Sequence, residues 1–67
     1  MKRNWIYKFW VNGFKMEVII EGTEEEFRAY IDTEFPFAKD GRYSGATDTE
    51  VAHHKALGLP IYLAPTL

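Results

Sequence analysis

Residues 4–21, NWIYKFWVNGFKMEVIIE, decide the fold of this chain. The pair Asn12-Gly13 lies between two runs that are rich in aromatic and β-branched residues. A type I′ turn needs a positive φ at both central residues, and Asn-Gly meets that need better than almost any other pair. The stretch therefore predicts an antiparallel β-hairpin with its turn at Asn12-Gly13.

The turn also sets the register of the two strands, which begins with Val11 opposite Phe14. Because side chains alternate between the faces of a strand, one face of the hairpin becomes entirely apolar. That face predicts the docking surface of a helix. It carries Trp5, Tyr7, Phe9, Val11, Phe14, Met16, Val18 and Ile20. The opposite face carries Trp10 opposite Lys15, Lys8 opposite Glu17, and Ile6 opposite Ile19.

Two capping boxes predict two helices. Thr23 with Glu26 opens the first helix, which should end near Glu34 because Pro36 disfavours helical geometry at the residue before it. Phe27, Tyr30 and Ile31 form its buried stripe.

Thr47 with Glu50 opens a second helix over roughly residues 48–57, and Gly58 suits a left-handed helix end. Residues 59–63 predict a short strand at the edge of the sheet.

Residues 37–45 contain the turn signals Asp40-Gly41 and Ser44-Gly45, and they predict an irregular connection. The predicted fold is therefore α+β, with the order ββααβ. A small antiparallel sheet, made of the hairpin and a short edge strand, is packed by one or two helices.

The chain has 67 residues and no cysteine, which predicts a single domain over residues 1–67 without a disulfide. A chain of this length is near the lower limit for folding alone. A dense aromatic core is the remaining means of stabilisation, and 16% of the residues are aromatic. We expect modest stability, or help from a partner, which leaves a homo-oligomer open.

The formal net charge of −2 argues against a general nucleic-acid binder, so direct nucleic-acid binding is not expected. No stretch has the length and apolar character to span a bilayer. Lys8 and the turn interrupt the N-terminal apolar run before it reaches signal-peptide length. We therefore expect a cytoplasmic location and no membrane partner.

Few residues could carry chemistry. His53 and His54 point about 100° apart on a helix, so they cannot chelate one ion together. Glu50 and His54 have the i, i+4 spacing of a helical metal pair, but no third ligand is nearby in the sequence. We expect no metal, no cofactor and no enzymatic activity.

The second face of the hairpin is a candidate interaction surface. Ile6, Trp10 and Ile19 would form an apolar patch rimmed by Lys8 and Lys15, and such patches mark protein interfaces. Two alternatives remain open. The second helix or the C-terminal tail packs on this face, or Trp10 stacks on the bases of a single strand while the lysines contact its phosphates.

Residues 44–52, SGATDTEVA, and 56–63, ALGLPIYL, resemble a loop–helix–strand segment of nucleoside 2-deoxyribosyltransferase-like proteins and related nucleotide-binding families. Those proteins carry Gly-Thr-x-x-Glu, then a helix, Leu-Gly-x-Pro and an apolar strand, and Ala46 replaces the glycine here. The resemblance implies that Glu50 contacts a sugar or acts as a nucleophile. The chain would then bind or sequester a nucleotide or nucleoside through Ser44, Thr47 and Glu50.

In format, as a single small domain without cysteine, the chain resembles the phage-encoded inhibitors of bacterial defence, such as anti-CRISPR proteins. This resemblance implies a non-enzymatic module that blocks a host protein in the host cytoplasm by occupying its surface. An acidic helix face, formed by Glu24, Glu25 and Asp32, would then meet a Lys/Arg-rich surface of a nucleic-acid-binding host protein. Trp10 would anchor a second contact, and such charge complementarity makes association fast and salt-dependent.

Overall fold

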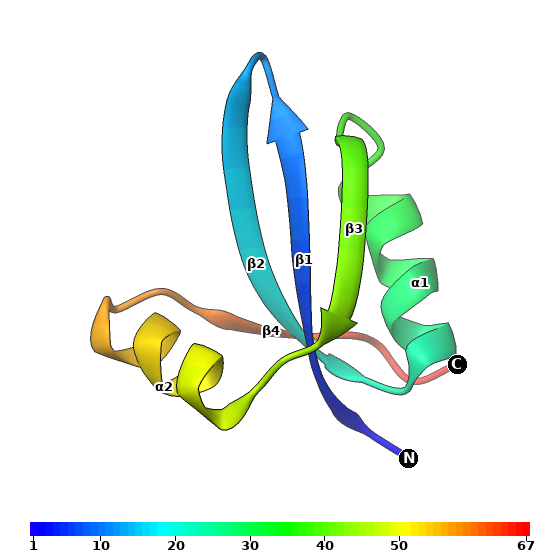
Figure 1. Cartoon of the computed structure of the whole chain (residues 1–67). Coiled ribbons are helices and arrows are strands. Elements are labelled where there is room, and N and C mark those ends of the chain that lie inside the picture. Colours follow the sequence, from blue (N-terminus) through cyan, green and yellow to red (C-terminus); the bar gives the residue numbers. More distant parts are fainter.

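A computed structural model describes all 67 residues and shows a four-stranded sheet with two helices. The elements follow the order ββαβαβ (Figure 1). They are β1 (Arg3–Val11), β2 (Phe14–Gly22), α1 (Glu24–Glu34), β3 (Lys39–Gly45), α2 (Asp48–Ala56) and β4 (Ile61–Leu63). Neither helix combines the length and the hydropathy that crossing a membrane requires.

The predicted hairpin is confirmed in every pair of its register. β1 and β2 are antiparallel, from Val11 opposite Phe14 at the turn to Arg3 opposite Gly22 at the base. Asn12 has a φ of 49° and Gly13 a φ of 81°, which are the two positive values that a type I′ turn requires. Local turn chemistry and apolar patterning thus determine the central part of the sheet.

The α+β class is confirmed, but the structure contains one strand more than the predicted order ββααβ. Residues 39–45, expected to be irregular, form β3, which pairs antiparallel with β1. The sheet order is β3-β1-β2-β4. β4 lies at an edge as predicted, but it runs parallel to β2, from Ile61 opposite Ile19 to Leu63 opposite Glu21, so the sheet is mixed.

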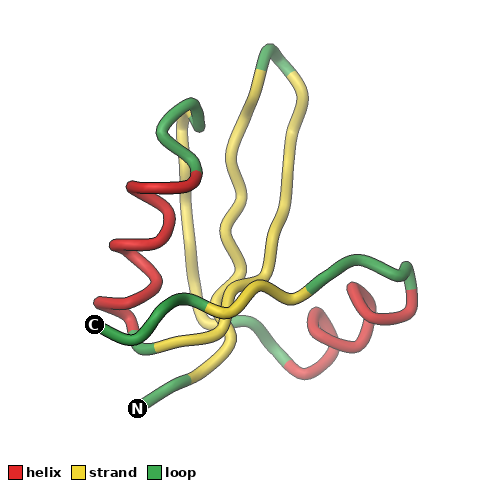
Figure 2. The backbone as a smooth tube through the Cα atoms, turned by 180° about the vertical axis from the view of Figure 1, so that it is seen from behind, coloured by secondary structure: helices red, strands yellow, loops and turns green.

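Both predicted capping boxes are present and set the starts of the helices. The hydroxyl of Thr23 accepts from the backbone N–H of Glu26, and the Thr47 hydroxyl accepts from that of Glu50, each at 3.1 Å. Gly58 follows α2 with a φ of 75°. Figures 1 and 2 show the two helices on opposite sides of the hairpin.

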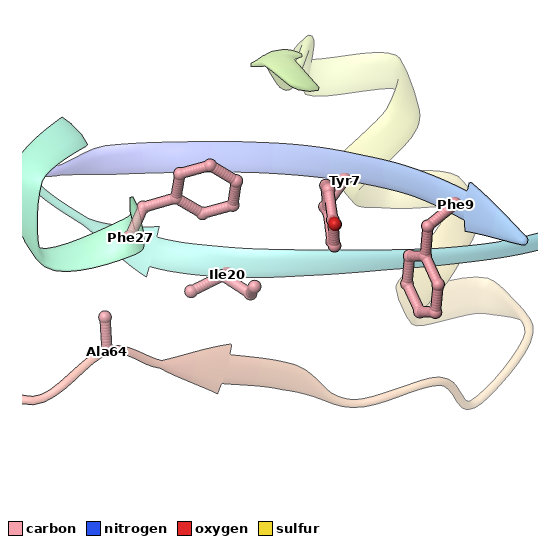
Figure 3. Packing of buried hydrophobic residues seen from close by; sticks show 5 residues of the cluster. All are labelled: Tyr7, Phe9, Ile20, Phe27 and Ala64. Atoms are coloured by element: carbon pink, nitrogen blue, oxygen red, sulfur yellow. The ribbon is translucent and has the colours of Figure 1, made fainter. Parts of the chain in front are cut away.

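The main core lies between α1 and the apolar face of the hairpin. Five buried residues form it, and they come from β1, β2, α1 and the segment after β4 (Figure 3). Partly buried side chains of α1, including Tyr30 and Ile31, pack against this cluster as the helix periodicity predicts. The five residues are Tyr7, Phe9, Ile20, Phe27 and Ala64.

A second buried cluster lies on the opposite face of the sheet. Ile6 and Ile19 are only 2% and 0% exposed, and His54 of α2 is 4% exposed. Ile6 and His54 line one cleft between α2 and the sheet, so α2 covers this part of the face. Of the two alternatives for the Ile6/Trp10/Ile19 face, the covering helix is therefore the correct one for Ile6, and Ile19 is buried opposite it on the same face.

Candidate interaction surfaces

The turn half of the hairpin carries an uncovered apolar groove on the same face as α1. Figures 1 and 2 show this half of the hairpin standing clear of α2 and β4. Phe14 is 72% exposed, Phe37 54% and Met16 44%, although the sequence placed Phe14 and Met16 on the helix-covered face. We call this surface the apolar groove. It has a volume of about 410 Å³ and is lined by Phe9, Val11, Asn12, Phe14, Met16, Val18, Phe35, Phe37 and Tyr62.

The edge of β2 beside this groove is open. β4 pairs only with Ile19, Ile20 and Glu21, so residues 14–18 have no strand on their outer side. The pair that flanks a two-residue turn is hydrogen-bonded, and hydrogen-bonded pairs then alternate along an antiparallel ladder. Lys15 and Glu17 consequently direct their backbone groups away from β1 and towards solvent.

Trp10 lies in a second groove, on the opposite face of the sheet, and is 44% exposed. The strand registers place Lys15 on one side of Trp10 and Lys39 on the other. We call this surface the basic groove. Its volume is about 630 Å³, and its lining residues are Ile6, Lys8, Trp10, Lys15, Asp40, Arg42, Tyr43 and Ser44.

The structure thus corrects the predicted Ile6/Trp10/Ile19 contact surface. Ile6 and Ile19 are too deeply buried to form an exposed patch with Trp10. Lys8 and Lys15 remain beside Trp10 as expected. Arg42 and Lys39 were missed by sequence reasoning, because they come from a strand that the sequence did not predict.

The predicted acidic face of α1 is only partly assembled. Glu24 turns towards β3, where its carboxylate accepts a 2.6 Å hydrogen bond from the Tyr43 hydroxyl, and this bond raises the pKa of Tyr43. Glu25 and Asp32 are exposed and lie seven residues apart, on the same side of the helix. Arg28 lies between them on that side, so the face carries mixed charge.

Glu26 links both ends of the chain to the start of α1. The residue is 6% exposed, and its side chain accepts hydrogen bonds from the backbone N–H of Thr23 at 2.9 Å and of Leu67 at 3.3 Å. Lys2 lies 3.7 Å away as an ion-pair partner. The bond from Thr23 is the main cause of its lowered pKa, with smaller contributions from Leu67 and Lys2, while burial opposes them.

Ser44, Thr47 and Glu50 do not converge on one site. The Glu50 carboxylate accepts a 2.9 Å hydrogen bond from the backbone N–H of Thr47, which lowers the pKa of Glu50 and completes the capping box. Ser44 lines the basic groove, whereas Glu50 lines the cleft under α2. The nucleotide-binding alternative stays a prediction, and the structure gives Glu50 a different, structural use.

The two histidines have different surroundings. His53 is exposed, whereas His54 is buried with Nδ1 at 3.3 Å from the backbone oxygen of Glu50. Nε2 of His54 is buried and has no hydrogen-bond partner. No group of three potential metal ligands occurs in the structure.

Replacing His54 with leucine is expected to raise the free energy of unfolding by about 1 kcal/mol. A buried polar atom without a partner costs about 1–3 kcal/mol, and leucine fills a similar volume without that atom. Urea unfolding measured for the His54→Leu and His53→Leu variants checks this, with the exposed histidine as the control. A loss of stability in His54→Leu would show that the contact of Nδ1 with the Glu50 backbone oxygen outweighs the cost of the unpartnered Nε2, or that Nε2 has a partner in solution.

No family model, curated protein or solved structure matches this chain.

Proposed function

We propose that the chain is a non-enzymatic protein-binding module that receives an extended apolar segment of a partner protein. The observation that carries the proposal is the apolar groove lying directly beside the open edge of β2. Such an edge offers backbone donors and acceptors to an added strand, and pockets beside it select alternate side chains of that strand.

The exposed side chains supply the driving force for such binding. Phe14, Met16 and Phe37 are each 44% exposed or more. Complete burial of one such side chain contributes on the order of 1.5–3 kcal/mol, and these three already retain some contacts within the chain. Lys15 and Glu17 point to the opposite face, where their charges oppose unspecific pairing of edges between copies.

A narrower form of the proposal is an inhibitor, phage-encoded and of the anti-CRISPR type, that blocks a host defence protein by occupying its surface. This narrower proposal is supported only by the similarity of the chain to such inhibitors in size, single-domain organisation and lack of cysteine. α1 lies on the same face as the apolar groove, so a partner held there could also reach Glu25 and Asp32. A Lys/Arg-rich partner surface would fit those two carboxylates.

The test uses Phe14→Lys as the disrupting variant and Leu57→Lys as its matched control. Leu57 is 60% exposed and lies at the end of α2, away from the apolar groove. Wild type and both variants are immobilised, exposed to the same host lysate, and the retained proteins are quantified by mass spectrometry. We expect the wild type and Leu57→Lys to retain the same host protein. Phe14→Lys should retain at least about tenfold less of it, which corresponds to a loss of about 1.4 kcal/mol in binding free energy.

Two outcomes would overturn the proposal. One is that Phe14→Lys and Leu57→Lys retain the host protein to the same extent, whether both bind it or both fail to bind it. The other is a concentration-dependent dimer in light scattering that Phe14→Lys dissolves, because a second copy would then occupy the groove. Hydrogen exchange of the complex adds a direct readout, with protection expected at the backbone amides of residues 15 and 17.

A further inference from the structure

We infer that the basic groove binds single-stranded nucleic acid, with Trp10 as a base-stacking platform and the surrounding cations as phosphate contacts. The inference concerns the face of the sheet opposite the apolar groove and does not depend on the protein-binding proposal. It rests on the arrangement of charges across three strands, on the exposed ring of Trp10, which has no aromatic partner in the chain, and on the volume of the groove.

The strand registers arrange the groove in two rows. One row runs from Trp10 on β1 to Lys15 on β2; Lys39 is the register partner of Trp10 on β3, beyond an irregularity in the ladder, and does not line the groove. The next row runs from Arg42 on β3 through Lys8 on β1 to Glu17 on β2. The groove therefore presents Arg42, Lys8 and Lys15 from three neighbouring strands around the exposed ring of Trp10.

Lys8 has one repelling and one attracting cross-strand neighbour, Arg42 on β3 and Glu17 on β2. Like charges directly opposite each other on neighbouring strands destabilise a sheet. The ion pairs in the structure are Lys2 with Glu26 and Lys15 with Glu17, so neither Lys8 nor Arg42 has a carboxylate partner within 4.0 Å. Arg42 lies on an edge strand and has only Lys8 opposite it, so an anion from outside the chain would offset the remaining repulsion, and that favours an anionic ligand.

The ring of Trp10 has no aromatic partner in the chain. Trp5 stacks on Phe27 at 5.8 Å and carries the Arg3 guanidinium over its ring at 4.9 Å. Trp10 makes neither kind of contact and remains 44% exposed within the groove. An exposed ring between cations suits a base followed by phosphates, since bases stack on aromatic side chains whatever their identity.

A single strand fits these features better than a duplex or an acidic protein segment. The bases of a duplex are stacked inside the helix, so a duplex would leave Trp10 without a partner. An acidic protein segment would use the cations but has no planar groups for the ring. A groove of about 630 Å³ is also large enough for a planar ligand group.

The net charge of −2 does not oppose this inference, because the charges are segregated. The acidic first turn of α1 lies on the other side of the sheet. Exposed charges farther apart than a Debye length of about 8 Å are largely screened at physiological salt. Asp40 lines the basic groove together with Lys8, Lys15 and Arg42, and Glu17 lies 3.8 Å from Lys15, so the cations outnumber these two carboxylates.

The experiment measures fluorescence anisotropy of a labelled oligothymidylate of about 12 nucleotides with the full chain at about 50 mM salt. We expect Trp10→Ala to weaken binding about 5- to 100-fold. Lys8→Glu should also weaken it and make the salt dependence shallower, since each phosphate contact on a single strand contributes about −0.7 to the slope of log K against log salt. Lys55→Glu, an equal charge change on an exposed residue of α2, is the matched control and should bind like the wild type.

Three results would overturn the inference: no binding of the oligonucleotide by the wild type, equal binding by Trp10→Ala, or an equal loss in Lys55→Glu. Competition distinguishes the other ligands. If a polyglutamate peptide displaced the labelled strand as effectively as unlabelled oligothymidylate, the groove would be a site for acidic protein segments. Tighter binding of a duplex than of a single strand would exclude stacking on Trp10. Circular dichroism of each variant confirms that the fold is retained.

Discussion

Replacing Phe27 with alanine is expected to remove most of the stability of the folded chain. Phe27 is fully buried and lies at the centre of the main core, where it stacks on Trp5 at 5.8 Å and meets Tyr43 at 4.8 Å between ring centroids. Truncation of a buried phenylalanine to alanine costs about 3–5 kcal/mol. A domain of 67 residues has a total free energy of unfolding of only about 3–10 kcal/mol.

Urea unfolding followed by tryptophan fluorescence measures this effect, since Trp5 contacts the replaced ring. Phe37→Ala is the matched control, because Phe37 is 54% exposed and its removal should cost much less. If the two variants unfolded at the same urea concentration, α1 would not be docked on the sheet as the structure shows.

The elements that the sequence predicted correctly are those in which local chemistry and apolar patterning agree. Asn12-Gly13 determines both the turn and the register, and the alternating apolar residues have only one face to bury. The two capping boxes likewise act within four residues of chain, through a Thr hydroxyl and a Glu carboxylate. Such signals do not depend on the rest of the fold.

β3 was missed because its sequence, KDGRYSG, is polar and rich in glycine. Its glycines indicate turns, but the structure uses them for space. A side chain at Gly41 would collide with the ring of Tyr7, whereas one at Gly45 would meet only the flexible end of Arg3. β3 is also an edge strand. It is held by its hydrogen-bonded pairing with β1 and not by an alternating apolar pattern, so its sequence gives no strand signal.

The sequence predicted only those residues of the candidate sites that lie on the hairpin. Trp10, Lys8 and Lys15 share a face in any correct register, so the sequence placed them together. Arg42 joins them only through the long-range pairing of β3 with β1. The covering of this face was left open as one alternative, because α2 is poorly amphipathic and its buried residue is the atypical His54.

Truncation of Ile19 to alanine is expected to cost about 2–5 kcal/mol, whereas truncation of Phe14 to alanine should cost about 1 kcal/mol or less. This order is the reverse of what the hairpin pattern alone suggests. The pattern assigns Phe14 to the helix-covered face and Ile19 to the face left open. In the structure Ile19 is 0% exposed on the face that α2 partly covers, and Phe14 is 72% exposed at the rim of the apolar groove.

Comparison of the two variants therefore distinguishes two models: a sheet that helices cover on both faces, and a hairpin that a helix covers on one face only. Equilibrium unfolding in urea gives the free energy of each variant, and an unchanged denaturant slope would show that the native and unfolded states remain comparable. A larger loss in Phe14→Ala than in Ile19→Ala would mean that α2 is not docked and that α1 reaches the turn. Burial of Ile19 would then depend on a partner, and the exposed part of the second face would extend well beyond Trp10.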